Sequence, residues 1–266
     1  IFCFFHKPDY NCFMNINQAF TILQQAGGIR AARIITQNNK KLSRLRVFFI
    51  ARQLRRGMPV AKIIHQKWFY GLSFYTNRHT LDPRPDTETL VSAVIADAAD
   101  GMRILDLGTG SGCVLVSLVK NIYGANGVGV ELSRAAARVA RRNIACHVPG
   151  RASVLRRSYH SRHIPGTPFD VIVSNPPYIA RGDSRVNSGA MHDPALALYA
   201  SDNGYYEYGV IAKNARDWLR PDGCVYLEIG DGMSDRVCKI FKDAGWGFVR
   251  AEKDLAGIVR VLVFKK

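Results

Sequence analysis

The sequence predicts an α/β protein: a doubly wound, mostly parallel sheet preceded by a small helical domain. From residue 81 onward, short apolar runs rich in β-branched residues alternate with segments of helical periodicity. This alternation is the pattern of a parallel sheet covered by helices. Before residue 69 the apolar residues recur at helical spacing instead. A chain of 266 residues has room for both parts.

The elements of the second part follow one another regularly along the chain. Strands are expected at residues 103–107, 127–131, 152–156, 169–174, 224–229, 248–252 and 258–264. Helices are expected at residues 88–98, 111–121, 133–143, 205–219 and 234–244. The last two strands lie too close together for a crossover helix between them, so we expect that pair to be antiparallel.

The first part is expected to contain three short helices. Gly27-Gly28 is expected to end the first of them, and a second follows directly. The third is expected over residues 42–56. Its inward face is expected to carry Leu45, Phe48, Phe49 and Leu54, and its arginines are expected to face outward.

These patterns predict how the chain is divided. Residues 1–13 lack periodicity and are interpreted as a disordered or misassigned N-terminus. We interpret residues 14–68 as the helical domain. The short, aromatic and β-prone stretch at residues 69–80 is interpreted as a hairpin linker, and residues 81–266 as the α/β domain.

The charges are distributed unevenly. Residues 1–80 carry 13 Lys and Arg against one Asp, whereas residues 81–266 carry 24 against 20 Asp and Glu. Such a basic surface suits an RNA-rich or acidic partner, and a solvated basic face is the alternative. The sequence has no run of 18 apolar residues, so no transmembrane helix is expected. Six cysteines without a CxxC pair are typical of reduced thiols in the cytosol.

The loop Asn175-Pro176-Pro177-Tyr178 directly follows the apolar run Phe169–Ser174. Proline has no N–H and restricts the preceding residue to extended geometry. The Asn175 amide and the neighbouring carbonyls should therefore point out of the strand end. Two such acceptors can hold both hydrogens of a planar –NH2 group, while Tyr178 offers a flat face beside it. Taken alone, a Pro-Pro turn after a strand is more often an ordinary loop.

A second motif lies upstream, at Asp106-Leu107-Gly108-Thr109-Gly110-Ser111-Gly112. A glycine-rich turn lets the backbone approach a ligand and directs the N–H groups of a helix N-terminus toward it. The spacing suits a nucleoside with an amino-acid tail better than a pyrophosphate. Glu131, at the end of the next strand, can accept hydrogen bonds from both ribose hydroxyls. Together the two motifs and Glu131 predict an S-adenosylmethionine-dependent methyltransferase that acts on an –NH2 nitrogen.

Residues 16–266 resemble the peptide chain release factor N5-glutamine methyltransferases, the PrmC/HemK family. The resemblance implies a class I S-adenosylmethionine-dependent methyltransferase domain, Rossmann-like with a seven-stranded mixed sheet, behind a helical domain that docks the substrate. Beyond the two motifs it rests on Phe69–Phe74, Pro83–Glu88, Asp193-Pro194-x-x-Ala197-Leu198, Leu227–Gly230 and Asp254-Leu255-Ala256-Gly257-x-x-Arg260.

The resemblance also implies roles for individual residues. Cofactor binding is implied for Asp106, Gly108, Thr109, Gly110, Ser111, Gly112, Glu131, Tyr159 and Asn175. Catalysis is implied for Asn175, Pro176 and Tyr178, and substrate binding for these residues together with Pro177 and Arg84. Ser158 stands where the family has an Asp before an aromatic residue. The contact with the adenine amino group is therefore expected to be lost or replaced.

The implied reaction is methyl transfer from S-adenosylmethionine to the glutamine of the Gly-Gly-Gln tip of class I release factors. Three alternatives stay open: methylation of a ribosomal protein glutamine, methylation of adenine N6 in nucleic acid, and a non-catalytic RNA- or ribosome-binding role. No metal is expected, because His160 and His163 lack further ligands at zinc-like spacing. A cytoplasmic monomer without a membrane partner is expected.

Overall fold

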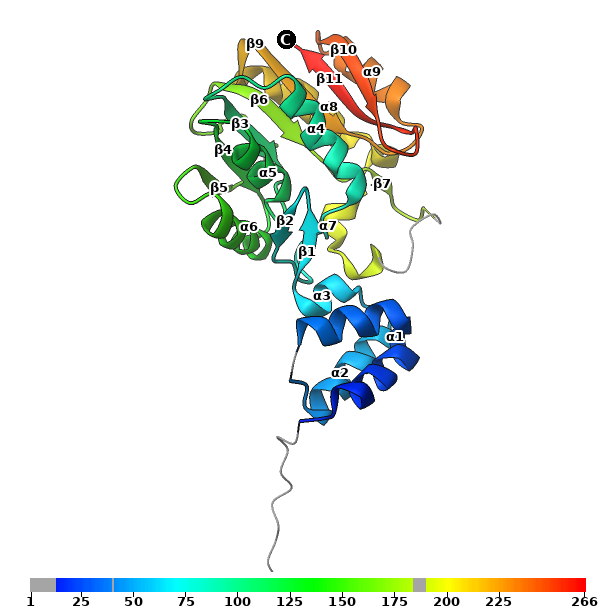
Figure 1. Ribbon diagram of the computed structural model, residues 1–266. Helices are drawn as coiled ribbons and strands as arrows, with labels where there is room; N and C mark the ends of the chain where they lie inside the picture. The colour runs from blue at the N-terminus through cyan, green and yellow to red at the C-terminus, as the bar shows by residue number, and fades with distance from the viewer. Residues whose placement is uncertain (1–12, 40, 184–189) are drawn as a thin grey trace, which may run out of the picture. The chain divides into compact units, whose positions relative to one another are not determined.

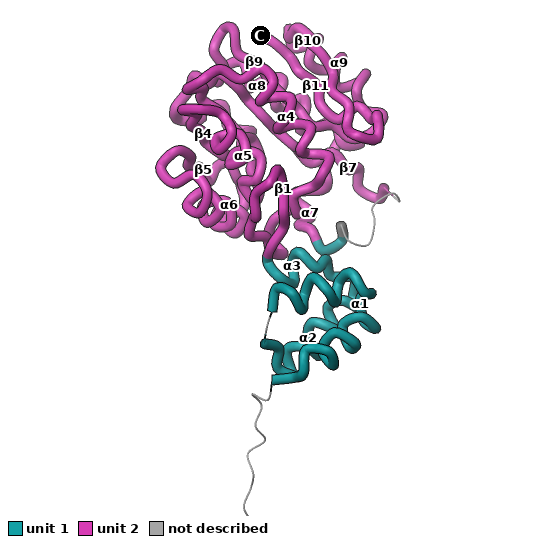
Figure 2. Tube along the Cα trace, in the orientation of Figure 1, with its two compact units in different colours: residues 1–65, 187–192 teal, residues 66–186, 193–266 magenta. Residues whose placement is uncertain are grey.

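The computed structural model describes residues 13–39, 41–183 and 190–266. Two compact units make up the chain: residues 1–65 with 187–192, and residues 66–186 with 193–266 (Figure 2). The expectation of a disordered or misassigned N-terminus concerns residues 1–13, which lie outside the described residues except for Phe13.

The first unit contains helices α1 (Ile16–Asn38), α2 (Arg44–Arg55) and α3 (Val60–Ile64). Gly28 interrupts α1 with a non-helical backbone (φ 83°, ψ 166°), so the break expected at the glycine pair is a kink between two helical segments. Residues of both helical segments and of α2 form a small apolar core. It is made by Ala19, Leu23, Ala31, Ala32, Ile35, Leu42, Val47, Ile50, Ala51 and Leu54.

The inward face predicted for the third helix is wrong for three of its four residues, and only Leu54 is buried as predicted. Leu45, Phe48 and Phe49 are 53%, 58% and 52% exposed, respectively. The buried face of α2 is instead the one that carries Val47 and Ile50. Both faces have apolar residues at helical spacing, and the smaller β-branched side chains fill the space against α1.

The first unit is unusual in its charge. Between residues 13 and 65 the chain has ten Lys and Arg and neither Asp nor Glu. Neutral side chains therefore cap its longer helices: Asn15 Oδ1 accepts from the Asn17 N–H (2.9 Å), and Ser43 Oγ accepts from the Arg46 N–H (3.3 Å). No first turn of these helices therefore has a carboxylate to interact with the positive end of the helix dipole.

The second unit is built on a seven-stranded mixed sheet, as predicted (Figure 1). The strand order is β10-β11-β9-β6-β3-β4-β5, and only β11 runs antiparallel to its neighbours. The antiparallel final pair expected from the short connection is confirmed. The strands are β3 (Arg103–Leu107), β4 (Asn126–Glu131), β5 (Ala152–Arg156), β6 (Phe169–Ser174), β9 (Leu219–Glu228), β10 (Gly247–Lys253) and β11 (Val259–Lys265).

Helices cover both faces of this sheet (Figure 1). Helices α4 (Glu88–Ala96), α5 (Cys113–Asn121) and α6 (Arg134–His147) pack on one face, and α8 (Tyr206–Trp218) and α9 (Ser234–Asp243) on the other. Successive strand residues point to opposite faces, so in β3 Ile104 enters the first core and Leu105 the second. Burial on both faces explains the continuous apolar runs of the central strands.

Smaller elements surround the sheet. Strands β1 (Lys67–Phe69) and β2 (Leu72–Phe74) form an antiparallel hairpin. Strands β7 (Ile179–Ala180) and β8 (Tyr199–Ala200) pair in parallel, and α7 (Ala195–Leu198) precedes β8. Among the described residues, no helix combines the length and the apolar character that crossing a bilayer requires.

Candidate active site

A cavity of about 310 Å3 lies where β3, β4, β5 and β6 end, at the carboxyl edge of the sheet. Ligands of open α/β sheets bind at this edge, because the loops after parallel strands converge there. Six of the predicted site residues line the cavity: Gly108, Gly110, Glu131, Tyr159, Asn175 and Pro177.

The glycine-rich turn after β3 forms one wall of the cavity. Gly108, Gly110 and Gly112 all have positive φ (73°, 56° and 80°), a conformation that other residues adopt only with strain. The Gly108 and Thr109 N–H groups donate to the Val130 carbonyl (2.9 and 3.0 Å) and so tie the turn to β4. The turn is therefore rigid and presents its backbone to the cavity.

Glu131 is fixed at the end of β4. Its Oε2 accepts from the Gly110 N–H (3.0 Å) and its Oε1 from the Ser133 N–H (2.8 Å). Burial raises the pKa of the carboxyl group, and these backbone hydrogen bonds oppose that rise. Each carboxylate oxygen has a second lone pair, so the group can still accept hydrogen bonds from a ligand in the cavity.

Other residues of the motif support the turn from behind. The Thr109 hydroxyl donates to Asp106 Oδ2 (2.6 Å), and both residues are buried. Burial raises the pKa of Asp106 to about 7 in spite of that hydrogen bond, and the charge of Glu131 adds to the rise. Asp106, Thr109, Ser111 and Gly112 are not among the residues that line the cavity. The hydrogen bond between Thr109 and Asp106 thus supports the turn from within the protein.

The Asn-Pro-Pro-Tyr loop leaves β6 next to this turn. The Ser174 hydroxyl donates to the Leu107 carbonyl (2.8 Å), which joins the ends of β6 and β3. Asn175 Nδ2 then donates to Thr87 Oγ1 (3.2 Å). Because Nδ2 of the Asn175 amide is directed at Thr87, Oδ1 of the same amide is directed away from Thr87.

A buried carboxyl group lies behind this loop. Glu228 ends β9, next to β6 in the sheet, and is 2% exposed. Burial raises its pKa to about 7, while the Thr87 hydroxyl and the Asn175 amide favour the ionised form. Its Oε2 has no hydrogen-bond partner among the described residues. Thr87, Asn175 and Glu228 thus form one buried polar cluster.

Tyr178 and Arg84 lie outside the described lining of this cavity. The Tyr178 ring packs against Gly230, where an added Cβ would come within 3.0 Å of it. Burial raises the Tyr178 pKa, so the phenol stays protonated. Arg84 Nη2 donates to the buried carboxylate of Asp193 (2.6 Å). This ion pair positions the guanidinium group at the lead-in to α4.

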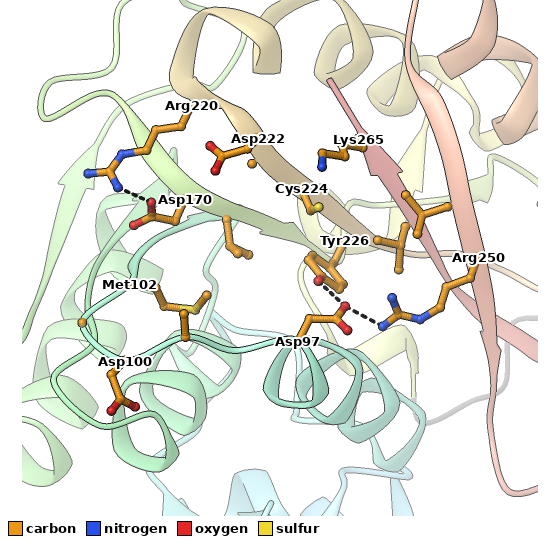
Figure 3. Close-up of a pocket in the computed structure, with 16 residues that line it drawn as sticks. Asp97, Asp100, Met102, Asp170, Arg220, Asp222, Cys224, Tyr226, Arg250 and Lys265 are labelled. Atoms are coloured by element: carbon orange, nitrogen blue, oxygen red, sulfur yellow. Dashed lines mark hydrogen bonds and ion pairs between the residues drawn. The ribbon is translucent and has the colours of Figure 1, made fainter.

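A larger hollow, of about 610 Å3, opens at the opposite edge of the sheet (Figure 3). Four of its charged residues form two ion pairs. In one of them, Asp97 accepts from Arg250 Nη2 (2.7 Å), and it also accepts from the Tyr226 hydroxyl (2.6 Å). Arg220 forms an ion pair with Asp170 in the same way. The hollow lies away from the glycine-rich turn and the Asn-Pro-Pro-Tyr loop, so we do not assign the chemistry to it.

Sequence reasoning missed part of the site. Thr87 is not among the predicted site residues, but its hydroxyl accepts a hydrogen bond from Asn175 and makes no capping bond to α4. Glu207 and His160 line the cavity but stand in no recognisable motif. Glu207 lies in the first turn of α8, far along the chain from the cofactor motif, so only the fold brings the two together.

The chain matches the Methyltransferase small domain family over residues 79–192. A methyltransferase from Pyrococcus furiosus has the same fold, with a TM-score of 0.56 and 19% identity, covering 74% of this chain and 89% of that one. The fold, the family match and the cavity at the carboxyl edge define a class I methyltransferase. The methyl donor of this class is S-adenosylmethionine.

Two curated relatives identify the family more closely. The release factor glutamine methyltransferase of Bradyrhizobium diazoefficiens is 36% identical over 257 residues, which are 92% of this chain and 86% of the relative. That of Agrobacterium fabrum is also 36% identical, over 79% of this chain and 75% of the relative. The chain belongs to the release factor glutamine methyltransferase family. It spans about half the length of the bifunctional methyltransferases of Rickettsia felis and Rickettsia typhi, which are 34% and 31% identical to it.

Proposed function

We propose that this protein transfers a methyl group from S-adenosylmethionine to the side-chain amide nitrogen of a glutamine. The substrate is the glutamine of the Gly-Gly-Gln tip of class I peptide chain release factors. The observation that carries the proposal is the orientation of Asn175, whose Nδ2 is bonded to Thr87 while the residue lines the cavity. The other atom of the amide, Oδ1, is a hydrogen-bond acceptor, and a substrate with an –NH2 group needs such an acceptor.

The cavity residues fit the cofactor. Glu131 is an acceptor-only carboxylate held by two backbone N–H groups, which suits the two ribose hydroxyls. The backbone of Gly108 and Gly110 lies open to the amino-acid tail. Leu132 and Tyr159 supply apolar surface for a flat base. We propose that Asp106, Thr109, Ser111 and Gly112 act by holding this wall in place.

The protein's part in the reaction is to position a weak nucleophile. An amide nitrogen is a poor nucleophile because its lone pair is delocalised. Asn175 Oδ1 and the Pro176 carbonyl accept the two amide hydrogens and aim the nitrogen into the cavity, where S-adenosylmethionine supplies an electrophilic methyl group. Such positioning contributes on the order of 7–11 kcal/mol to a barrier. Pro177 and Tyr178 bound the substrate site, and Arg84 is proposed to hold the substrate backbone at its mouth.

The test combines two substrates with two variants. The protein is incubated with labelled S-adenosylmethionine and a release factor, in parallel with the same factor lacking the Gly-Gly-Gln glutamine. Label is expected only on the intact factor. Asn175→Ala should abolish transfer and keep the fold, whereas Asn126→Ala, an exposed asparagine at the start of β4, should leave the rate unchanged. A normal rate for Asn175→Ala would refute the assignment.

The remaining proposals concern partners. We propose that residues 14–68 dock the release factor, and that their positive charge also keeps the enzyme near RNA-rich ribosomes. A monomer acting in the cytoplasm would suit both roles. Label on a ribosomal protein or on RNA, with none on the release factor, would instead favour a different glutamine or adenine N6 as the methyl acceptor.

A further inference from the structure

The loop after β5 carries no carboxylate into the cavity. Ser158 lines the cavity with a hydroxyl group, whose oxygen accepts the His160 N–H (3.1 Å) of the same loop. One of the two lone pairs of this neutral oxygen thus holds the loop, and a hydroxyl is a weaker acceptor than a carboxylate. If the cavity holds the base of a nucleoside beside Tyr159, as proposed above, a charged acceptor for the base's amino group must come from elsewhere.

A carboxylate from another element lines the same cavity and contacts this loop. Glu207, in the first turn of α8, lines the cavity together with Ser158, and its side chain is 14% exposed. Its Oε2 accepts from the Tyr159 hydroxyl (2.6 Å) and lies 2.9 Å from His160 Nε2. Both contacts use one oxygen, and the described residues give Oε1 no hydrogen bond.

Helix α8 also fixes this loop at other points. Asn214 Nδ2 donates to the Tyr159 carbonyl (3.3 Å), and Trp218 Nε1 donates to the Arg162 carbonyl (2.6 Å). Three residues of α8 therefore hold the loop in place beside the helix: Glu207, Asn214 and Trp218. Burial and the neighbouring Glu207 charge raise the pKa of Tyr159, so its phenol stays protonated and donates to the carboxylate.

We propose that Glu207 supplies, from α8, the carboxylate that recognises the exocyclic amino group of the cofactor's adenine. Oε1 accepts a hydrogen bond from that amino group, while Tyr159 and His160 hold Oε2. A carboxylate that would otherwise be satisfied by water favours a base with a 6-amino donor over one without it. The proposal rests on the proposed cofactor site and adds to it the residue that selects the base.

The test measures binding rather than turnover. Dissociation constants are determined by calorimetry for S-adenosylhomocysteine and for its purine analogue, in which hydrogen replaces the 6-amino group. The wild-type protein should prefer the adenine compound by about 10- to 100-fold, as expected for a hydrogen bond to a charged group. Glu207→Gln should reduce this preference to within about threefold, because Tyr159 claims the amide oxygen and turns the –NH2 group toward the adenine amino group.

Two further variants sharpen the result. Ser158→Asp in the Glu207→Gln background should restore the preference by returning a carboxylate from the loop. Glu252→Gln, which removes a carboxylate on β10 that is paired with Arg250, should leave it unchanged. If Glu207→Gln lacks a thermal transition, Glu207→Asp replaces it, and the shorter side chain should likewise lower the preference.

The outcomes separate this inference from the proposed function. A Glu207→Gln protein that binds both compounds with the wild-type preference would overturn the role of Glu207 alone. A wild-type protein that binds neither compound would overturn the cofactor site, and the inference with it.

Discussion

Replacing Thr87 by Val tests how Asn175 is held. The two side chains have nearly the same shape, so the change removes the hydroxyl and leaves the packing of this buried residue almost intact. Asn175 Nδ2 then loses its 3.2 Å hydrogen bond, and Glu228 loses the hydroxyl that favours its ionised form. The Asn175 amide is no longer restricted to the orientation that directs Oδ1 toward the substrate.

The size of the effect follows from the cost of a buried polar group without its partner. That cost is about 1–3 kcal/mol, which corresponds to a rate reduced about 5- to 150-fold at 1.36 kcal/mol per factor of ten. Single-turnover transfer to a release factor at saturating S-adenosylmethionine measures it. Cofactor affinity should change less than the rate, because Thr87 does not line the cofactor cavity and is connected to it through Asn175.

Thr87→Ser is the matched control, since it keeps the hydroxyl and removes only a methyl group. Its rate should stay within about threefold of wild type. A Thr87→Val enzyme with the wild-type rate would refute the reasoning. Equal losses in the Ser and Val variants, with equally lowered melting temperatures, would mean that Thr87 acts through packing.

Three further predictions concern the same unit. Folding raises the Glu228 pKa from 4.5 to about 7. The stability that the protonated group contributes is therefore fully present below pH 4.5 and is lost as the pH rises through 7. Glu228→Gln should remove this loss, on the order of 3 kcal/mol, when the free energy of unfolding is measured as a function of pH. Gly204→Ala should lower the unfolding free energy by about 1–3 kcal/mol, because φ is +93° and the new Cβ would overlap the Tyr178 carbonyl; an unchanged urea midpoint would contradict this. Glu131→Gln should weaken S-adenosylhomocysteine binding about 10- to 100-fold by calorimetry, and unaltered affinity would exclude Glu131 as a ribose acceptor.

The sheet could be predicted from the sequence because its strands are buried on both faces. The run Phe169–Ser174 is apolar except for Asp170 and its final serine, and it is followed by Asn175 and two prolines, so length and composition identify it as a strand. The glycine-rich turn and Glu131 could be placed together, since both follow strands whose carboxyl ends share one edge. The local sequence pattern and the parallel topology are therefore sufficient to predict the half of the site formed by the glycine-rich turn and Glu131.

The rest depends on tertiary contacts that no local pattern encodes. In α2, Phe48 and Phe49 belong to an apolar stripe at helical spacing that competes with the stripe of Val47 and Ile50, and periodicity cannot choose between two such faces. Glu207 similarly looks like an ordinary acidic residue in a first helical turn. Its contact with Tyr159 joins residues 48 positions apart in the chain.

The first unit, with ten cations and no carboxylate over residues 13–65, responds to ions in the opposite sense to most domains. Most domains have surface ion pairs that weaken as salt is added. Here the helices have no carboxylate with which to form ion pairs, and repulsion among the cations is the main charge interaction to be screened, so added salt should tighten their packing. A polyanion bound to these helices would have the same effect by linkage, because it neutralises the folded unit where its charges are most concentrated. The rigidity of this unit is thereby coupled to the presence of an acidic surface beside it.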